Sequence, residues 1–330
     1  MKHHTSDFQA LHDFRRLSDQ VARRASPELV FEIRRARDRR ELAIQLCEAT
    51  EGAIPSFSLS ATPRDDPEQL GGAIRRVLGI TYQDQIQYRP DYPALNWWRG
   101  VLEQAGVLVF QARDVPVKEA RAFSITDAPF PVVVTNIKDA PRARLFSMLH
   151  EICHIALQKG GVCDLYEEGD GPSTDDRQIE VLCNRAAGAA LVPRECLLSE
   201  PVVQQKGRAT IWDDEEVRFL ADRYGVSREV LLRRLLICGR TTEEFYRARR
   251  RELLREYEAL EQQRQPGFAP PHRVAVSVAG TFFVRLVLSS YYQDKITASD
   301  VADFLEIRLK HLKTIEAEVL GSSGGTGAGA

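Results

Sequence analysis

The chain has 330 residues, of which 43% are hydrophobic, and its formal net charge is −2 at pH 7. This length allows two domains or one large one, and the near-neutral charge argues against nucleic acid as the main partner. The sequence has no run of about 18 apolar residues that could cross a membrane. Its polar N-terminus lacks a secretion signal, so we expect a cytoplasmic protein without a membrane partner.

The cysteines are scattered and form no C-x-x-C pair. This pattern is typical of buried, reduced thiols in a cytoplasmic protein, and it does not favour a cysteine-based zinc site. The six residues are Cys47, Cys153, Cys163, Cys183, Cys196 and Cys238.

Residues 1–66 are expected to form a helical N-terminal extension and a linker. Between Glu28 and Glu51, apolar residues recur at helical spacing among many arginines, which favours a charged scaffold helix. Three prolines with Ser and Asp then indicate a linker. No helix-turn-helix pattern is found at this end of the chain.

Residues 67–200 are expected to form the main domain, as a mixture of helices and strands. Its helix at 94–106 is amphipathic and ends at a glycine, as helices commonly do. Two of its strands flank a proline-containing turn, which predicts an antiparallel pair. A helix then begins at Pro141. The predicted strands are 107–111, 122–126 and 132–136.

The helix that begins at Pro141 contains the motif His150-Glu151-x-x-His154. Positions i and i+4 share one face of a helix, so both histidines can point at one metal ion. Glu151 leans toward the same side. This pattern is typical of a zinc hydrolase, in which Zn²⁺ lowers the pKa of its water to roughly 7 and the glutamate takes the proton. A buried helix with two unrelated histidines could carry the same five residues.

A zinc peptidase needs a third protein ligand and leaves the fourth position to water. Glu180 stands at the start of a second predicted helix, 180–191, and a ligand on a packed helix is better pre-organised than one on a loop. Alternatively, Glu180 could be a first-turn residue that only interacts favourably with the helix dipole. The acid-rich loop at 159–176 offers the competing carboxylates Asp164, Glu167, Glu168, Asp175 and Asp176.

Three segments follow the main domain. Residues 201–265 are expected to be helical and hold the helix-turn-helix-like pattern A-x-x-x-G-V-S at 217–236. Its arginines could contact DNA phosphates, but a structural or protein-docking role is favoured. Residues 266–320 predict a small C-terminal helical segment, and the Gly-rich tail 321–330 should be disordered.

The motifs between residues 121 and 193 resemble those of the ImmA/IrrE family of metallopeptidases. The family pattern F-(S/T)-L-x-H-E-x-x-H resembles 146–154, and E-x-x-A-N-x-F-A-x-x-L-L-x-P resembles 180–193. Weaker similarity extends over about residues 85–315. Cys183 and Ala186 stand where the family often has Ala and Phe.

The resemblance implies an α+β, zincin-like core with helical N- and C-terminal extensions. It implies the metal ligands His150, His154 and Glu180, with Glu151 as general base. Zn²⁺ is the expected metal, although Mn²⁺ or Fe²⁺ could fill such a site. Family members typically cut a Cro/cI-type helix-turn-helix repressor, which de-represses genes for stress response or mobile elements. The target is expected to be encoded separately, because residues 1–60 show no helix-turn-helix.

We therefore expect a zinc endopeptidase that acts on a protein partner, with strand 121–126 or 131–136 pairing with the substrate. The alternative is a DNA- or protein-binding transcription regulator, or a toxin–antitoxin component, in which the zincin core is only structural. The intact motif argues against this alternative, and DNA contact is not favoured.

Overall fold

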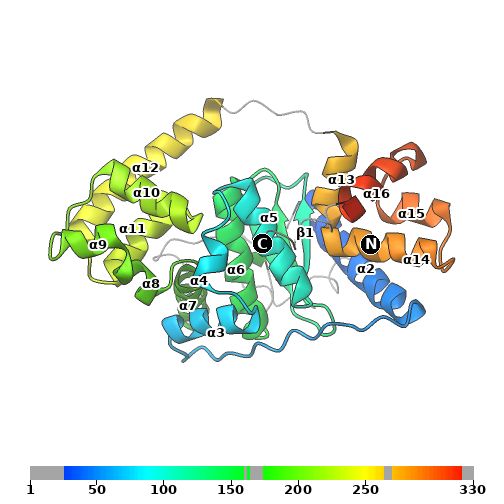
Figure 1. The fold of residues 1–330 in the computed structure, drawn as a ribbon, viewed down its shortest axis with the longest axis horizontal. Coiled ribbons are helices and arrows are strands. Elements are labelled where there is room, and N and C mark those ends of the chain that lie inside the picture. The colour runs from blue at the N-terminus through cyan, green and yellow to red at the C-terminus, as the bar shows by residue number, and fades with distance from the viewer. Residues whose placement is uncertain (1–25, 160–161, 164–173, 264–269, 322–330) are drawn as a thin grey trace, which may run out of the picture.

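The computed structural model describes residues 26–159, 162–163, 174–263 and 270–321. A small mixed sheet lies at the centre, with helices on both of its faces (Figure 1). Within the described residues its strand order is β1-β3-β2-β4. The fold is therefore the predicted α+β, zincin-like class with helical extensions. The strands are β1 (Leu108–Ala112), β2 (Ala122–Ile125), β3 (Val132–Asn136) and β4 (Val162–Cys163).

The pairing of the strands confirms the predicted antiparallel pair. β2 runs antiparallel to β3, with Ala122 opposite Thr135, while β1 runs parallel to β3. β4 pairs antiparallel with β2 and lies in a region where the sequence predicted only loop. Because side chains alternate between the faces of a sheet, these strands contribute to two separate cores.

The first core lies between the sheet and the helices that carry the metal motif. Val109 and Val133 point into it from the sheet. α6 contributes apolar residues from almost all of its circumference, as expected for a helix packed on several sides. The helices of this layer are α3 (Pro67–Val77), α4 (Tyr82–Gln85), α5 (Tyr92–Gln104), α6 (Pro141–Ala156) and α7 (Thr174–Leu191).

The second core lies on the opposite face and is built from both ends of the chain. Leu108, Phe110 and Val134 point into it from the sheet. Helix α2 packs there beside the C-terminal helices, so segments far apart in sequence form one layer (Figure 1). The elements are α2 (Pro27–Ala49), α13 (Pro271–Ala279), α14 (Thr281–Tyr292), α15 (Ala298–Phe304), η1 (Leu309–His311) and α16 (Leu312–Gly321).

The remaining helices, α8 to α12, form the end of the molecule that lies away from α2 and the C-terminal helices (Figure 1). α10 and α11 reproduce the predicted helix-turn-helix geometry. Gly225 ends α10 in the left-handed region at φ +70°, and the Ser227 side chain accepts a hydrogen bond from Val230 N at the start of α11. The helices are α8 (Arg194–Ser199), α9 (Pro201–Lys206), α10 (Asp214–Tyr224), α11 (Arg228–Ile237) and α12 (Glu243–Gln263).

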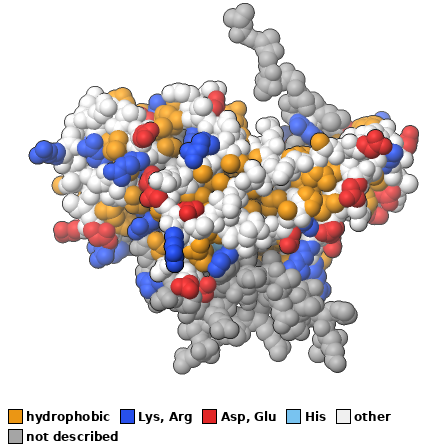
Figure 2. Space-filling view, turned by 90° about the horizontal axis from the view of Figure 1, so that it is seen from below, with side chains coloured by type: hydrophobic (Ala, Val, Ile, Leu, Met, Phe, Trp, Pro, Cys, Tyr) orange, Lys and Arg blue, Asp and Glu red, His pale blue; other side chains and the backbone are white. Residues whose placement is uncertain are grey.

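Residues 51–66 run without regular structure along the lower edge of Figure 1 and connect α2 to α3. Seen from below, hydrophobic side chains gather along the middle of this face, and charged ones are scattered around them (Figure 2). Among the described helices, no single one is long and apolar enough to cross a membrane. Only α13 and α14 taken together reach that length and composition, and they are bent by 102° at Gly280. Of the predicted tail 321–330, Gly321 is the last residue of α16, and 322–330 lie outside the described residues.

Candidate metal centre

The two histidines of α6 and Glu180 of α7 meet in the first core. His150 Nε2 lies 3.0 Å from His154 Nε2. Glu180 places one carboxylate oxygen 3.3 Å from His150 Nε2 and the other 3.3 Å from His154 Nε2. Within the described part of the chain, these three residues form the one group of His, Cys, Asp and Glu side chains able to hold a metal ion.

The spacing of these atoms fits a tetrahedral divalent ion. Bonds of about 2.0–2.1 Å to nitrogen and oxygen keep neighbouring ligands of a tetrahedral ion about 3.3–3.4 Å apart. The observed separations of 3.0 to 3.3 Å are close to this value. Two imidazoles and one carboxylate are also a donor set that suits such an ion, and three ligands leave one position open.

The ionisable groups of the three side chains influence one another strongly. Burial opposes protonation of His150, but the hydrogen bond and charge of Glu180 outweigh it and raise the pKa of His150 to about 9. Burial likewise opposes ionisation of Glu180, yet hydrogen bonds from both imidazoles hold its pKa well below the usual range. A cation bound to these ligands would therefore compete with a proton for His150.

Glu151 is completely buried beside this group, at 0% exposure. Its negative charge adds to the raised pKa of His150, which places its carboxylate within electrostatic reach of the ligands. A carboxylate in this position can take part in proton transfer at the site.

Glu180 is not a first-turn residue, as the sequence had suggested. α7 begins at Thr174, six residues earlier than expected, and Asp175 and Asp176 occupy its first turn. The helix-dipole role therefore falls to those aspartates. Neither belongs to the metal-binding group, and the other competitors, Asp164, Glu167 and Glu168, lie outside the described residues.

The helix-turn-helix-like pair packs inward against α7 and the rest of the first core. α11 contacts α7, α10 and α12, and its Leu231 and Leu235 are fully buried. Arg234 is 1% exposed; it donates to Val192 O and forms an ion pair with Glu68 of α3. The more exposed arginines also face carboxylates. Their pairs are Arg228–Glu256, Arg233–Glu229, Arg249–Asp214 and Arg250–Glu229.

The strand order corrects the predicted place of substrate pairing. β3 is bonded to β1 on one side and to β2 on the other, so residues 131–136 have no free edge and that prediction was wrong. The outer edge of β2 is paired with β4 at Ala122 and Phe123, and Ser124 and Ile125 lie beyond this pairing.

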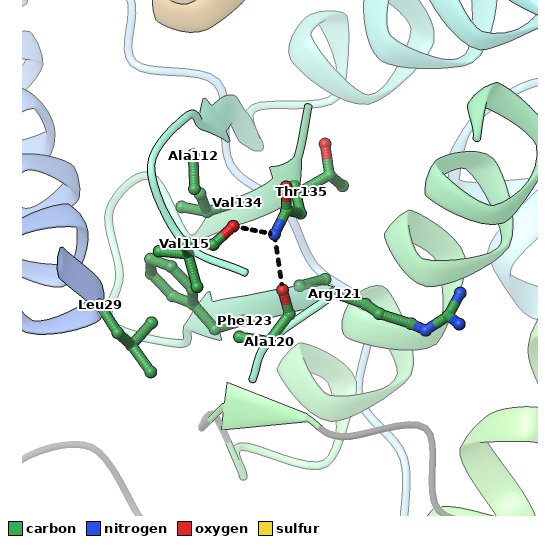
Figure 3. Close-up of a pocket in the computed structure, with 10 residues that line it drawn as sticks. Leu29, Ala112, Val115, Ala120, Arg121, Phe123, Val134 and Thr135 are labelled. Atoms are coloured by element: carbon green, nitrogen blue, oxygen red, sulfur yellow. Dashed lines mark hydrogen bonds between the residues drawn. The ribbon is translucent and has the colours of Figure 1, made fainter. Parts of the chain in front are cut away.

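A narrow pocket lies on the opposite face of the sheet and is distinct from the metal group. Leu29 of α2 and Phe123 and Val134 of the sheet line it, and all three belong to the second core (Figure 3). The Asn136 amide nitrogen donates to Val115 O and Ala120 O beside it. These bonds give Asn136 a structural role at the end of β3.

Two buried polar residues near α6 were not predicted as part of the site. Arg144 of α6 is 1% exposed and donates to Gln111 of β1, which is 2% exposed. Gln111 ends the apolar run 107–110, and Arg144 immediately precedes the apolar residues Leu145 and Phe146. A polar residue within a predicted buried element could therefore have drawn attention to them.

Comparison with known proteins agrees with this geometry. The sequence model of a family described as IrrE N-terminal-like domain matches residues 102–236. That range runs from the end of α5 through the sheet and both metal-binding helices to α11. No curated protein matches the chain. Residues 102–236 thus form a domain of the ImmA/IrrE family of metallopeptidases.

Proposed function

We propose that the protein is a zinc-dependent endopeptidase that cleaves a helix-turn-helix repressor. The observation that carries this proposal is the close group formed by the two imidazoles and the Glu180 carboxylate, with buried Glu151 next to His150 on the same helix. The match to a metallopeptidase family supports the reaction class. Mn²⁺ or Fe²⁺ would fit the same donors.

The residues of the site have separate roles in this proposal. When bound, the divalent cation supplies Lewis-acid chemistry that acidifies a water and polarises the scissile carbonyl. His150, His154 and Glu180 hold the cation on two packed helices. Glu151 takes the proton from the attacking water and delivers it to the leaving amine. Its complete burial strengthens its interactions with the charges formed during the reaction.

The substrate is proposed to bind as an added strand at the β4 side of the sheet. The free edge of β1 is covered, because a Cβ at Gly280 would lie 2.7 Å from Val109 O. β3 is interior, so among the described strands the remaining edge is formed by β4 and by Ser124 and Ile125 of β2. An extended peptide could pair there through its main chain.

The proposed substrate is a separately encoded Cro/cI-type repressor, whose loss would de-repress stress-response or mobile-element genes. The helix-turn-helix-like pair of this chain is not proposed to read DNA. Its second helix is buried against the core, and its arginines already face carboxylates. A protein-docking role for the helices that follow Pro193 remains part of the proposal.

The test is to incubate the zinc-loaded protein with the product of a neighbouring repressor gene and measure intact masses. The proposal expects two fragments from a single cut, and none with Glu151→Gln, which should still bind zinc. Cleavage by Glu151→Gln would contradict the role of Glu151. An uncut repressor, together with specific DNA binding by this chain, would favour a transcription regulator with a structural zincin core.

A further inference from the structure

A partly buried chain of hydrogen bonds joins the metal-binding helix to the C-terminal helical segment. Arg144 Nη1 of α6 donates to Gln111 Oε1 of β1 over 2.9 Å. Ser277 Oγ of α13 donates to the same oxygen over 3.3 Å. The side-chain oxygen of Gln111 therefore accepts one hydrogen bond from α6 and one from α13.

Helix α13 is fixed at this point by a second contact. Arg99 Nη2 of α5 donates to Ser277 O over 2.9 Å and to Val109 O over 3.1 Å. Directly after α13, Glu103 of α5 accepts from Phe282 N at the start of α14 over 3.0 Å. These bonds hold the bend between α13 and α14 against β1, so that Ser277 has a defined position relative to Gln111.

The contact lies close enough to the metal group to affect its geometry. Arg144 precedes His150 by six residues on the same continuous helix, which is about 9 Å along the axis. A buried guanidinium that loses a hydrogen-bond acceptor is destabilised, so the bond to Gln111 favours one placement of α6 on the sheet. Metal ligands need placement to within about 0.5 Å, so a small shift of α6 would alter the site.

We propose that Gln111 is a positioning residue that couples α13 to α6, so that the C-terminal helical segment helps to set metal affinity. The inference rests on the proposed function, because it requires a metal at His150, His154 and Glu180. Gln111 acts through Arg144 and does not contact the metal. Ser277 of α13 donates a second hydrogen bond to the same Gln111 oxygen.

The test compares metal affinity among variants of the full chain. Gln111→Met removes the acceptor, Ser277→Ala removes the α13 donor, and Gln111→Glu restores an acceptor for Arg144. Ser290→Ala is the matched control. It also deletes a serine hydroxyl from the C-terminal segment, but that hydroxyl is more deeply buried than Ser277 and bonds to Leu286 O within α14. Affinity is measured by competition with a chromogenic chelator, and ligand geometry by the absorption spectrum of the Co²⁺-loaded protein.

The expected result is metal binding about tenfold weaker in Gln111→Met, as for loss of other groups that orient metal ligands. Ser277→Ala should weaken binding in the same direction, with a changed Co²⁺ spectrum. Gln111→Glu and Ser290→Ala should match the wild type in affinity. If Gln111→Met does not fold, Ser277→Ala decides. Wild-type affinity and spectrum in the folded variants would overturn the inference alone, whereas a wild-type chain that binds no metal would overturn the proposed function as well.

Discussion

At the scale of single residues, the Glu180 carboxylate favours the protonated form of His150. His150 lies 3.3 Å from a Glu180 oxygen, and this carboxylate raises the pKa of His150 to about 9 despite burial. A histidine with a raised folded-state pKa stabilises the fold fully below its unfolded pKa of 6.5. That contribution is lost as the pH rises through about 9. Metal binding must displace the same proton.

The first prediction is that zinc binding releases a proton between pH 7 and about 9. Apparent affinity should rise by about tenfold per pH unit in this window, because the ligand must be deprotonated. Titration calorimetry in two buffers of different ionisation enthalpy measures the released proton. Equal heats in both buffers at pH 7.5 would contradict the expected protonation of His150.

The second prediction concerns the third ligand. Glu180→Ala should weaken metal binding by at least about 100-fold, because it removes a direct ligand where loss of a supporting group already costs 10- to 100-fold. Asp175→Ala, an exposed carboxylate of the same helix, is the control and should bind as the wild type does. Chelator competition measures both. Equal losses in the two variants would point to a site elsewhere on α7.

Helical periodicity explains why the main site residues could be predicted. His150 and His154 are one turn apart on α6, and Glu180 lies on α7, which packs beside α6. Gln111 and Arg144 could not be paired from sequence, since their contact depends on how α6 lies across β1. The start of α7 was missed because its acidic first turn has the composition of a loop, although such residues also stabilise a helix N-terminus.

At the scale of elements, the position of Glu180 depends on how closely α3 packs against α7. A Cβ at Gly71 would lie 2.7 Å from Ala189 Cβ and 2.8 Å from Ala190 N. Cβ atoms in proteins essentially never come within 3.0 Å of such atoms. The close packing of α3 on α7 therefore requires a glycine at position 71. The neighbouring Gly72 has space, as its nearest atom would be a side-chain nitrogen of Arg76 at 3.4 Å.

The third prediction compares these two glycines. Gly71→Ala should destabilise the protein by about 1–3 kcal/mol, because it overpacks the crossing. Gly72→Ala should be neutral or stabilise by up to about 1 kcal/mol, since alanine favours a helix. Urea denaturation gives both free energies of unfolding. A Gly71→Ala protein as stable as Gly72→Ala would show that the two helices pack less closely.

At the scale of the whole molecule, the two ends of the chain share one core. Phe283 and Val287 of α14 are buried with Leu29 and Ile33 of α2 on the back of the sheet. The sequence predicted a charged scaffold helix for the segment of α2 and a small helical segment for that of α14. The sequence could not show that segments more than 200 residues apart cover the same face of the sheet. The spacing of apolar residues indicates a helix but does not identify the segment against which it packs.

The fourth prediction follows from this shared core. A chain ending at residue 265 loses α13–α16 and uncovers the edge of β1. Each exposed large apolar side chain costs about 1.5–3 kcal/mol, and several together exceed the stability of a typical domain. Thermal melting should therefore show no cooperative transition. Removal of residues 322–330 alone is the control, and a shortened chain that melts like this control would contradict the shared core.

The most direct test of the metal centre is anomalous X-ray scattering from crystals of the zinc-loaded protein at the zinc edge. The predicted result is one peak per chain, about 2.0–2.2 Å from His150 Nε2, His154 Nε2 and a Glu180 carboxylate oxygen. A peak at any other group of residues, or coordination that omits Glu180, would contradict it.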